Sequence, residues 1–276
     1  MHRIHIVGCS SRSGTTLLME LMKNCFDIDL FAEHEDRILN FPTKKCKIFL
    51  TKKPGDIIKI EPILRVMKNL SVIYMVRDPR DVIVSKHRKN PDLYWTGLGF
   101  WKAYTPIGKK LESHPRFLTI RYEDLTSNPN KVQCFIQEKI PYLKQTRLFE
   151  EFNEKISVSK KSIEALNGVR AVSTSRIGNW RNHLPRIKEQ IRKHGSISDD
   201  LIYYGYEKDE NWLNILENVE DVNYESFLSE YPQFRKFKKW RFAYKIFPYL
   251  LLIGHNNSIL AIKHFLSQFW AVILKN

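Results

Sequence analysis

Two short stretches carry side chains that could bind phosphate groups. The first, residues 8–16, reads GCSSRSGTT and stands between an apolar strand-like run and an apolar helix-like run. A turn rich in glycine and hydroxyl residues at such a place offers backbone N–H groups and a helix N-terminus to an anion. In a Walker A loop a lysine follows the second glycine. Here Gly14 is followed by Thr15, and the cation has moved back to Arg12. The stretch therefore predicts a site that binds an anion but does not carry out the chemistry of nucleoside triphosphates.

The second stretch, residues 72–85, reads VIYMVRDPRDVIVS. A buried strand is predicted to end at Arg77, and Pro79 suits the first turn of a helix. A guanidinium at the strand end and the Ser85 hydroxyl on that helix could hold one phosphate from two sides. Taken alone, Arg77 and Asp78 could simply form a local ion pair. Together with the first loop, the phosphate interpretation is favoured.

The elements that must position these residues alternate along the chain. Strands are predicted at 4–7, 47–50, 72–76 and 117–120, and helices at 16–24, 61–69, 80–88, 96–111 (interrupted at Pro106) and 130–139. Short apolar strands separated by helices indicate an α/β fold, a P-loop-NTPase-like parallel sheet flanked by helices. Ligands bind such sheets at the carboxyl ends of the strands. The turns after Val7, Leu50 and Val76 should therefore open on one edge. Trp95, Trp101 and Tyr104, which fall near a helical pattern, are predicted to lie in the core rather than to stack on a substrate.

The 276 residues have a formal net charge of +15. Such a basic chain favours partners that carry several negative charges. A solvated basic face is the alternative, and no nucleic-acid motif is present. Cys9, Cys25, Cys46 and Cys134 show no metal-ligand spacing and are interpreted as reduced thiols. The first strand begins near residue 3, which leaves no room for a leader. We therefore expect a cytoplasmic enzyme.

The chain changes character near residue 225, so a domain at 1–224 and a helical C-terminal extension at 225–276 are predicted. Residues 234–241 interleave basic and aromatic side chains, and largely apolar stretches follow at 247–253 and 259–274. Neither stretch is a clean run of about 20 apolar residues, so a transmembrane span is not expected. Helices packed on the domain and an amphipathic hairpin on an anionic membrane surface both remain open.

Both stretches resemble motifs of the PAPS-dependent sulfotransferases, where PAPS is 3′-phosphoadenylyl sulfate. RSGTTL at 12–17 is similar to the loop that binds the 5′-phosphosulfate, and RDPRD at 77–81 with Ser85 is similar to the 3′-phosphate motif. RYEDL at 121–125 resembles a strand-end motif whose tyrosine lies beside the adenine. TSRIGNWRN at 174–182 resembles a late segment whose preceding loop closes over the 3′-phosphate. The four pieces occur in the family's order.

The resemblance implies in-line transfer of a sulfuryl group from PAPS to a hydroxyl or amine, with no metal required. Arg12 and the N–H groups of residues 13–16 could stabilise charge on the sulfuryl oxygens and the leaving phosphate. The residues implied in binding PAPS are Arg12, Ser13, Gly14, Thr15, Thr16, Arg77, Ser85, Tyr122, Ser175 and Arg176.

The acceptor also needs a base to take its proton. Where one branch of the family carries K-T-H, this chain has Lys52-Lys53-Pro54, which is closer to the K-T-P form of bacterial and Golgi-like relatives. In those relatives a glutamate after the first helix can act as base. Glu33 is our choice, with Glu35 and His34 as alternatives. Lys52 is the predicted cation on the transferring group, with Lys53 as alternative.

The sequence therefore predicts a PAPS-dependent sulfotransferase whose acceptor is a glycan, a glycolipid or a related molecule. Nucleic acid is not expected as a partner, and the C-terminal extension could contact a membrane surface. Two other functions remain open. A P-loop small-molecule kinase would require ATP and magnesium, and a catalytically inactive nucleotide-binding protein would bind PAPS without turnover.

Overall fold

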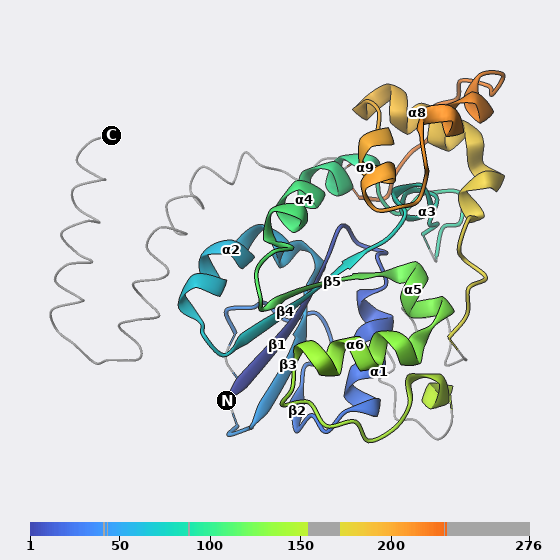
Figure 1. Ribbon diagram of the computed structural model, residues 1–276. Coiled ribbons are helices and arrows are strands. Elements are labelled where there is room, and N and C mark those ends of the chain that lie inside the picture. Colours follow the sequence, from blue (N-terminus) through green and yellow to red (C-terminus); the bar gives the residue numbers. More distant parts are fainter. Residues whose placement is uncertain (41, 43, 88, 154–171, 229, 231–276) are drawn as a thin grey trace, which may run out of the picture. The chain divides into compact units, whose positions relative to one another are not determined.

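The computed structural model describes the chain except for residues 41, 43, 88, 154–171, 229 and 231–276 (Figure 1). The chain divides into two compact units. The first comprises residues 1–58 and 70–232 and contains the sheet and every predicted site residue. The second comprises residues 59–69 and 233–276, of which 59–69 are described. The basic and apolar stretches predicted in the tail, at 234–241, 247–253 and 259–274, lie outside the described residues.

A parallel sheet of five strands in the order β2-β3-β1-β4-β5 forms the centre of the first unit. The strands are β1 (His2–Gly8), β2 (Leu30–Phe31), β3 (Ile48–Lys52), β4 (Leu70–Val76) and β5 (Phe117–Arg121). Ile4 of the central strand pairs with Leu50 on one side and with Ser71 on the other. The predicted α/β fold with a parallel sheet is confirmed, and the two-residue β2 is the one strand of this sheet that the pattern did not predict.

Helices cover both faces of the sheet in the first unit. In Figure 1, α1 (Thr15–Cys25) and α6 (Pro129–Lys139) lie on one face and α4 (Leu98–Leu111) on the other. The further helices are α2 (Ile57–Val66), which begins at the end of the first unit, α3 (Pro79–Ile83), α5 (Tyr122–Ser127), α8 (Leu184–His194) and α9 (Ser198–Tyr203). Short 3₁₀ helices occupy Pro54–Asp56, Phe149–Asn153, Asn179–His183 and Glu210–Leu216. Among the described residues, none of these helices has the length and apolar character needed to span a membrane.

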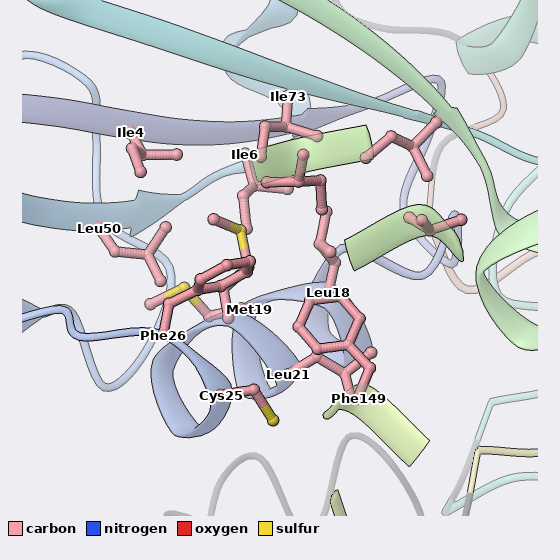
Figure 2. Close-up of a cluster of buried hydrophobic side chains, with 14 of the residues drawn as sticks. Ile4, Ile6, Leu18, Met19, Leu21, Cys25, Phe26, Leu50, Ile73 and Phe149 are labelled. Carbon is pink, nitrogen blue, oxygen red and sulfur yellow. The ribbon is translucent and has the colours of Figure 1, made fainter. Parts of the chain in front are cut away.

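The hydrophobic core between the sheet and α1 fixes where that helix begins. Figure 2 shows Leu18 and Leu21 of α1 on the side that faces Ile6 and Leu50 of the sheet. All four side chains are fully buried, and burying each one stabilises the fold by about 1.5–3 kcal/mol. Because α1 is held in this way, its N-terminus lies at the carboxyl end of β1, where the phosphate site was predicted.

Tyr74 of β4 points to the opposite face of the sheet, toward α4. A Cβ atom at Gly108 of α4 would lie 2.4 Å from Cε1 of Tyr74, so only glycine allows this approach. The predicted interruption of α4 at Pro106 is wrong, because the helix is continuous. Pro106 lies on the exposed face, where the carbonyl that loses its N–H partner can be hydrated. The other face of α4 is buried and includes Trp101.

The helix predicted at 80–88 is shorter in the structure, because α3 ends at Ile83. Ser85 therefore lies just beyond α3 rather than within it. Its carbonyl accepts the Trp95 N–H over 2.7 Å, so the chain folds back from this point. The helices α5, α8 and α9 were not predicted, since their apolar patterns are short.

Candidate functional site

The loop between β1 and α1, residues 9–14, contains two residues in the left-handed region of backbone space. Arg12 has φ 69° and Gly14 has φ 93°. For the non-glycine residue this conformation costs on the order of 1–2 kcal/mol. The Ser13 hydroxyl donates to the Ser10 carbonyl over 2.8 Å and closes the turn. Gly14 is the N-cap of α1 and has no side chain to cap the first turn. This arrangement leaves the helix N-terminus suited to an anion.

Arg77, the first residue after β4, joins this loop to the late segment of the chain. Its guanidinium donates from Nη1 to the Arg12 carbonyl over 3.1 Å and from Nη2 to the Arg176 carbonyl over 3.0 Å. Its own carbonyl accepts the Trp101 indole N–H over 3.1 Å. Three stretches predicted to bind the nucleotide are thus brought together by one side chain.

Asp78, which could have formed an ion pair with Arg77, pairs with Arg80 instead. Its Oδ2 atom lies 2.7 Å from Nη2 of Arg80, and its Oδ1 atom accepts the Arg80 backbone N–H. Burial would lower the pKa of Arg80, but the neighbouring carboxylates Asp78 and Glu207 raise it. Arg77 therefore donates to carbonyl groups rather than to Asp78. Its charge acts on the Asp81 carboxylate, where it opposes the rise in pKa that burial causes.

Tyr122, the first residue of α5, lies against the loop. Its ring centroid is 4.2 Å from the Arg77 guanidinium carbon, and a Cβ atom at Gly14 would lie 2.5 Å from its Cδ2 atom. Glycine is required at position 14 for both its φ value and this approach. Tyr122 is 7% exposed, so only a small part of the ring is open to adenine, and that role stays a prediction.

Three arginines, Arg12, Arg77 and Arg176, share one region around the loop. The pKa of Arg12 is lowered by burial first and then by the positive charges of Arg176 and Arg77. Like charges this close repel each other, so an anion between them would be stabilised by all three. This excess of positive charge is the main electrostatic property of the site.

Lys52, at the end of β3, lies at the start of α1. Its Nζ atom donates to Thr16 Oγ1 over 2.9 Å and lies 3.9 Å from Oε1 of Glu35. The side chain is buried, and burial lowers its pKa, an effect that the charges of Glu35 and Glu20 oppose. The predicted cation therefore lies beside the loop at residues 9–14, which we call the anion loop.

The acidic segment that supplies the candidate bases runs beside β3. The Ala32 N–H donates to the Leu50 carbonyl and the Asp36 N–H to the Lys52 carbonyl, each over 3.0 Å. Glu33, His34 and Glu35 are all exposed in the stretch between these two bonds. Glu35 forms an ion pair with Lys52. Which of the three candidates acts as the base stays a prediction.

The late segment is held to α3 by Asp81. Its two carboxylate oxygens accept the Gly178 N–H over 2.8 Å and the Trp180 N–H over 3.0 Å. The Arg80 guanidinium carbon lies 4.1 Å from the Trp180 ring centroid. Sequence reasoning did not assign Asp81 a role; its carboxylate positions the stretch that carries Arg176.

The two hydroxyl groups predicted to bind the 3′-phosphate are both close to this region. Ser85 Oγ donates to the Asp81 carbonyl over 3.1 Å. Ser175 is exposed, and its N–H donates to Ser173 Oγ over 3.2 Å. Their predicted contacts with phosphate, like the other predicted ligand contacts, remain predictions.

Cys9 and the other cysteines complete the site description. All four cysteines are free, and burial raises the pKa of the Cys9 thiol to about 12. Cys9 is therefore a protonated packing residue rather than a nucleophile. Within the described part of the chain, no three His, Cys, Asp or Glu residues are grouped so that they could hold a metal ion.

One family model matches most of the chain, and several solved structures are similar to it. The family model described as the sulfotransferase domain matches residues 3–202. A mouse sulfotransferase complexed with PAP is 14% identical, with 74% of this chain and 88% of that chain covered and a TM-score of 0.43. The sulfotransferase domain of the Synechococcus PCC 7002 olefin synthase is 16% identical, with 65% and 87% covered and a TM-score of 0.44. A retinol dehydratase in complex with androsterone and PAP is 13% identical, with 81% and 83% covered and a TM-score of 0.40. No curated protein matches the chain.

Proposed function

We propose that this chain, which belongs to the sulfotransferase domain family, sulfates a hydroxyl or amine of a glycan, a glycolipid or a related acceptor. The family match confirms the predicted enzyme class, a PAPS-dependent sulfotransferase, and with it PAPS as co-substrate. The acceptor class, the bacterial and Golgi-like branch, the cytoplasmic location and the role of each site residue are parts of the proposal. The match is to a family of sulfotransferases, which argues against the kinase alternative.

The convergence of Arg12, Arg77 and Arg176 on the loop before α1 is the observation that carries the proposal. PAPS has anionic groups at both ends of its ribose. We assign the 5′-phosphosulfate to Arg12 and the N–H groups of residues 13–16, and the 3′-phosphate to Arg77, Arg176 and the hydroxyls of Ser85 and Ser175. The bonds from Arg77 to the Arg12 and Arg176 carbonyls support the two sites being adjacent.

In the proposed reaction the acceptor oxygen attacks sulfur while the bond from sulfur to the 5′-phosphate oxygen breaks. The acceptor proton passes to a carboxylate, and adenosine 3′,5′-bisphosphate leaves. Lys52 and Arg12 stabilise the negative charge on the sulfuryl and phosphate oxygens. The contact of Lys52 with Thr16, over 2.9 Å, supports this role because it keeps the ammonium at the N-terminus of α1.

Glu33 remains the proposed base, and we propose that Glu35, which forms an ion pair with Lys52, positions that lysine. Glu35 would hold Lys52 in place, and Glu33 would take the proton. Glu33→Gln should then lower kcat by about 10²–10⁴-fold, the usual contribution of a general base, without weakening nucleotide binding. Glu35→Gln should have a smaller effect on kcat. The reverse order of effects would assign the base to Glu35, and equal small effects would point to His34.

Calorimetric titration with adenosine 3′,5′-bisphosphate and with ATP–magnesium tests the nucleotide site. The wild type should prefer the bisphosphate. Arg176→Ala removes a charge but keeps the carbonyl that Arg77 binds, and it should weaken the bisphosphate about tenfold or more. Arg77→Ala should weaken it further, because it also frees both loops.

Arg65→Ala is the matched control, because that side chain is 75% exposed and forms a local ion pair with Glu61. It should leave the affinity unchanged. Preference for ATP–magnesium, or equal affinity in Arg77→Ala and the wild type, would contradict the proposal. Bisphosphate binding without turnover of PAPS on any acceptor would favour an inactive nucleotide-binding protein.

A further inference from the structure

The edge of the sheet at β5 is open in the described part of the chain. β5 is the last strand in the order β2-β3-β1-β4-β5, so one side of it has no partner strand among the described residues. On its other side the Val72 N–H donates to the Arg116 carbonyl over 2.8 Å. Because the backbone groups of successive residues in a strand point to opposite sides, the N–H and carbonyl groups of Thr119 face the open side. Such groups can pair with a further strand.

The two edges of the sheet differ in how well they are protected against such pairing. β2, at the far edge, has two residues, and a very short edge strand resists the addition of another. β5 has five residues, FLTIR, with no proline and with its single charge at the last position, Arg121. Proline and a central charge are common protections of an edge strand. β5 is therefore the edge of this sheet that is suited to accept another strand.

A groove of about 960 Å³ lies along this edge, and all five residues of β5 line it. α6 supplies one wall, and Tyr203 and Tyr204, at the end of α9 and just beyond it, supply the other. Tyr203 is 53% exposed. Its hydroxyl donates to Glu112 Oε2 over 2.5 Å, so this acidic side chain is bonded within its own wall. An unpaired strand between two walls is the setting in which an extended peptide adds to a sheet.

The α6 wall carries Lys131, Phe135 and Lys139, which we call the basic stripe. Its members are four residues apart, so they lie on one face of the helix. Phe135 is 37% exposed, and Lys139 Nζ lies 5.8 Å from its ring centroid. Lys139 also pairs with Glu138 over 3.0 Å, whereas Lys131 has no ionic partner among the described residues. The stripe therefore offers an apolar ring between two positive charges.

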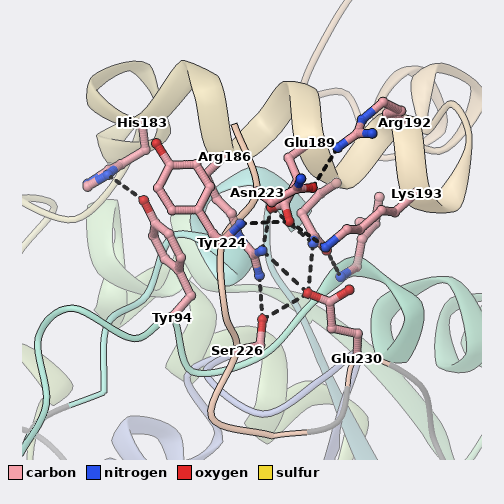
Figure 3. A network of polar contacts seen from close by, with 12 residues as sticks. Tyr94, His183, Arg186, Glu189, Arg192, Lys193, Asn223, Tyr224, Ser226 and Glu230 are labelled. Carbon is pink, nitrogen blue, oxygen red and sulfur yellow. Dashed lines mark hydrogen bonds and ion pairs between the residues drawn. The ribbon is translucent and has the colours of Figure 1, made fainter. Parts of the chain in front are cut away.

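The basic residues of α8 are used differently. Figure 3 shows them in the ionic network around the buried Arg186, where Lys193 pairs with Glu189 over 2.5 Å and Arg192 donates to Asn223 Oδ1 over 2.8 Å. These charges hold other parts of the same chain. The basic stripe of α6, by contrast, lines an open groove.

The spacing of the basic stripe matches that of an extended strand. Residues four apart on a helix are separated by about 6 Å along its axis. Residues two apart on a strand are separated by about 6.6 Å and point to the same side. α6 lies beside β5 and runs in the opposite direction (Figure 1). A strand paired with β5 would therefore present three alternate side chains to the stripe, and the stripe favours an acidic, an apolar and an acidic one.

We propose that the open edge of β5 binds an extended acidic segment of a partner protein, in which two acidic residues stand two positions before and after an apolar one. Main-chain hydrogen bonds to β5 hold the segment, and the basic stripe selects it. This binding goes beyond the proposed reaction and does not require PAPS.

Two other occupants fit the edge less well. A second copy of this chain, joined at β5 around a two-fold axis, would bring two basic stripes together, and like charges repel. The chain's own last segment does not supply the pattern, because residues 231–276 contain no Asp or Glu.

Fluorescence anisotropy with two labelled peptides, STEVIVETS and STKVIVKTS, tests the charge preference on the full-length protein. The wild type should bind the acidic peptide about tenfold or more tightly than the basic one. Lys131→Glu combined with Lys139→Glu should reverse the preference. Equal binding of the two peptides by the wild type, or an unchanged preference in the double variant, would overturn the inference.

Lys44→Glu combined with Lys45→Glu is the matched control. It makes the same change in charge at two exposed residues that precede β3. This variant should keep the preference of the wild type. A reversal here too would assign the preference to the net charge of the protein and not to the basic stripe, which would overturn the inference.

Two N-methylated forms of the acidic peptide test the strand pairing. One has the methyl group on the nitrogen of the central isoleucine, and the other has it on the nitrogen of the valine before it. In a paired strand only one of these two N–H groups donates to β5. One form should therefore bind about tenfold more weakly than the unmethylated peptide, and the other within about threefold of it. Equal affinities of the two forms would contradict strand pairing.

Two further measurements identify the other occupants. Saturating adenosine 3′,5′-bisphosphate should leave the Kd for the acidic peptide unchanged. Displacement of the peptide would place it at the anion loop and overturn the inference, while the sulfotransferase proposal would stand. Light scattering of the protein alone should give a monomer. A dimer that the acidic peptide dissociates would assign the edge of β5 to a second copy and would also overturn the inference.

Discussion

Two regions of the molecule contain buried arginines, and the partners of the arginine side chains differ between them. In the network around α8, Arg186 lies within 2.6 Å of Glu189 and 3.4 Å of Glu230. Around the anion loop, Arg77 donates to carbonyl groups and Arg12 has arginine neighbours that lower its pKa. The first arrangement satisfies its own charges, whereas the second gains stability from an added anion. The difference supports our proposal that the second region binds the nucleotide, and it predicts that the first region acts as scaffold.

The largest expected effect is on stability, from Arg186→Met. The variant leaves Glu189 buried with part of its compensating charge removed, and loss of one partner of a buried pair costs about 3–5 kcal/mol. Urea unfolding followed by circular dichroism should show this loss. The double variant Arg186→Met with Glu189→Leu should recover a good part of it. A loss of less than about 1 kcal/mol in the single variant would contradict the scaffold role.

Arg12→Met should lower activity while leaving stability nearly unchanged, which is the opposite of the effect expected for Arg186→Met. Removal of the Arg12 guanidinium relieves repulsion with Arg77 and Arg176, so the unfolding midpoint should stay within a few degrees of the wild type or rise. The rate of PAPS turnover should fall by about 10²–10³-fold, the usual cost of removing one charge-stabilising donor. Steady-state kinetics and thermal unfolding on the same preparation measure both. Unfolding comparable to that of Arg186→Met would remove the distinction between the two regions.

The smallest expected effect is a pH dependence of the scaffold region. Burial would raise the pKa of Glu230, but bonds from His194 and Ser226 and the charge of Arg186 lower it to about 2. A carboxylate with a lowered folded pKa contributes stability above its unfolded pKa, near 4.5, and loses it as pH falls toward 2. Wild-type stability should fall by on the order of 2 kcal/mol across that window.

Glu230→Gln lacks this titration and should start less stable at pH 7 while losing less on acidification. Urea unfolding at several pH values between 2 and 7 measures how the free energy of unfolding of each protein depends on pH. The same pH dependence in both proteins would show that Glu230 does not stabilise the fold through its charge.

Sequence reasoning located the loop between β1 and α1 correctly because its signals are local. Glycine at position 14 needs a positive φ, and the apolar runs before and after it have the periods of a strand and of a helix. The bounds of α3 were less well predicted, because that helix ends where Ser85 bonds to Trp95, ten residues further along. A local sequence pattern does not show which distant residue will form such a hydrogen bond.

The amino-acid sequence by itself determined the order of the four longer strands and of the helices α1, α2, α3, α4 and α6 along the chain, the family, and the residues available for charge stabilisation. Only the tertiary structure decided which of them meet. Arg77 and Arg176 are 99 residues apart, Lys52 meets Glu35 rather than a nearer acid, and Phe227 reaches Trp95 from beyond the family domain. Periodicity specifies which face of an element is buried, whereas contacts across such distances depend on how the elements pack, which only the folded chain fixes.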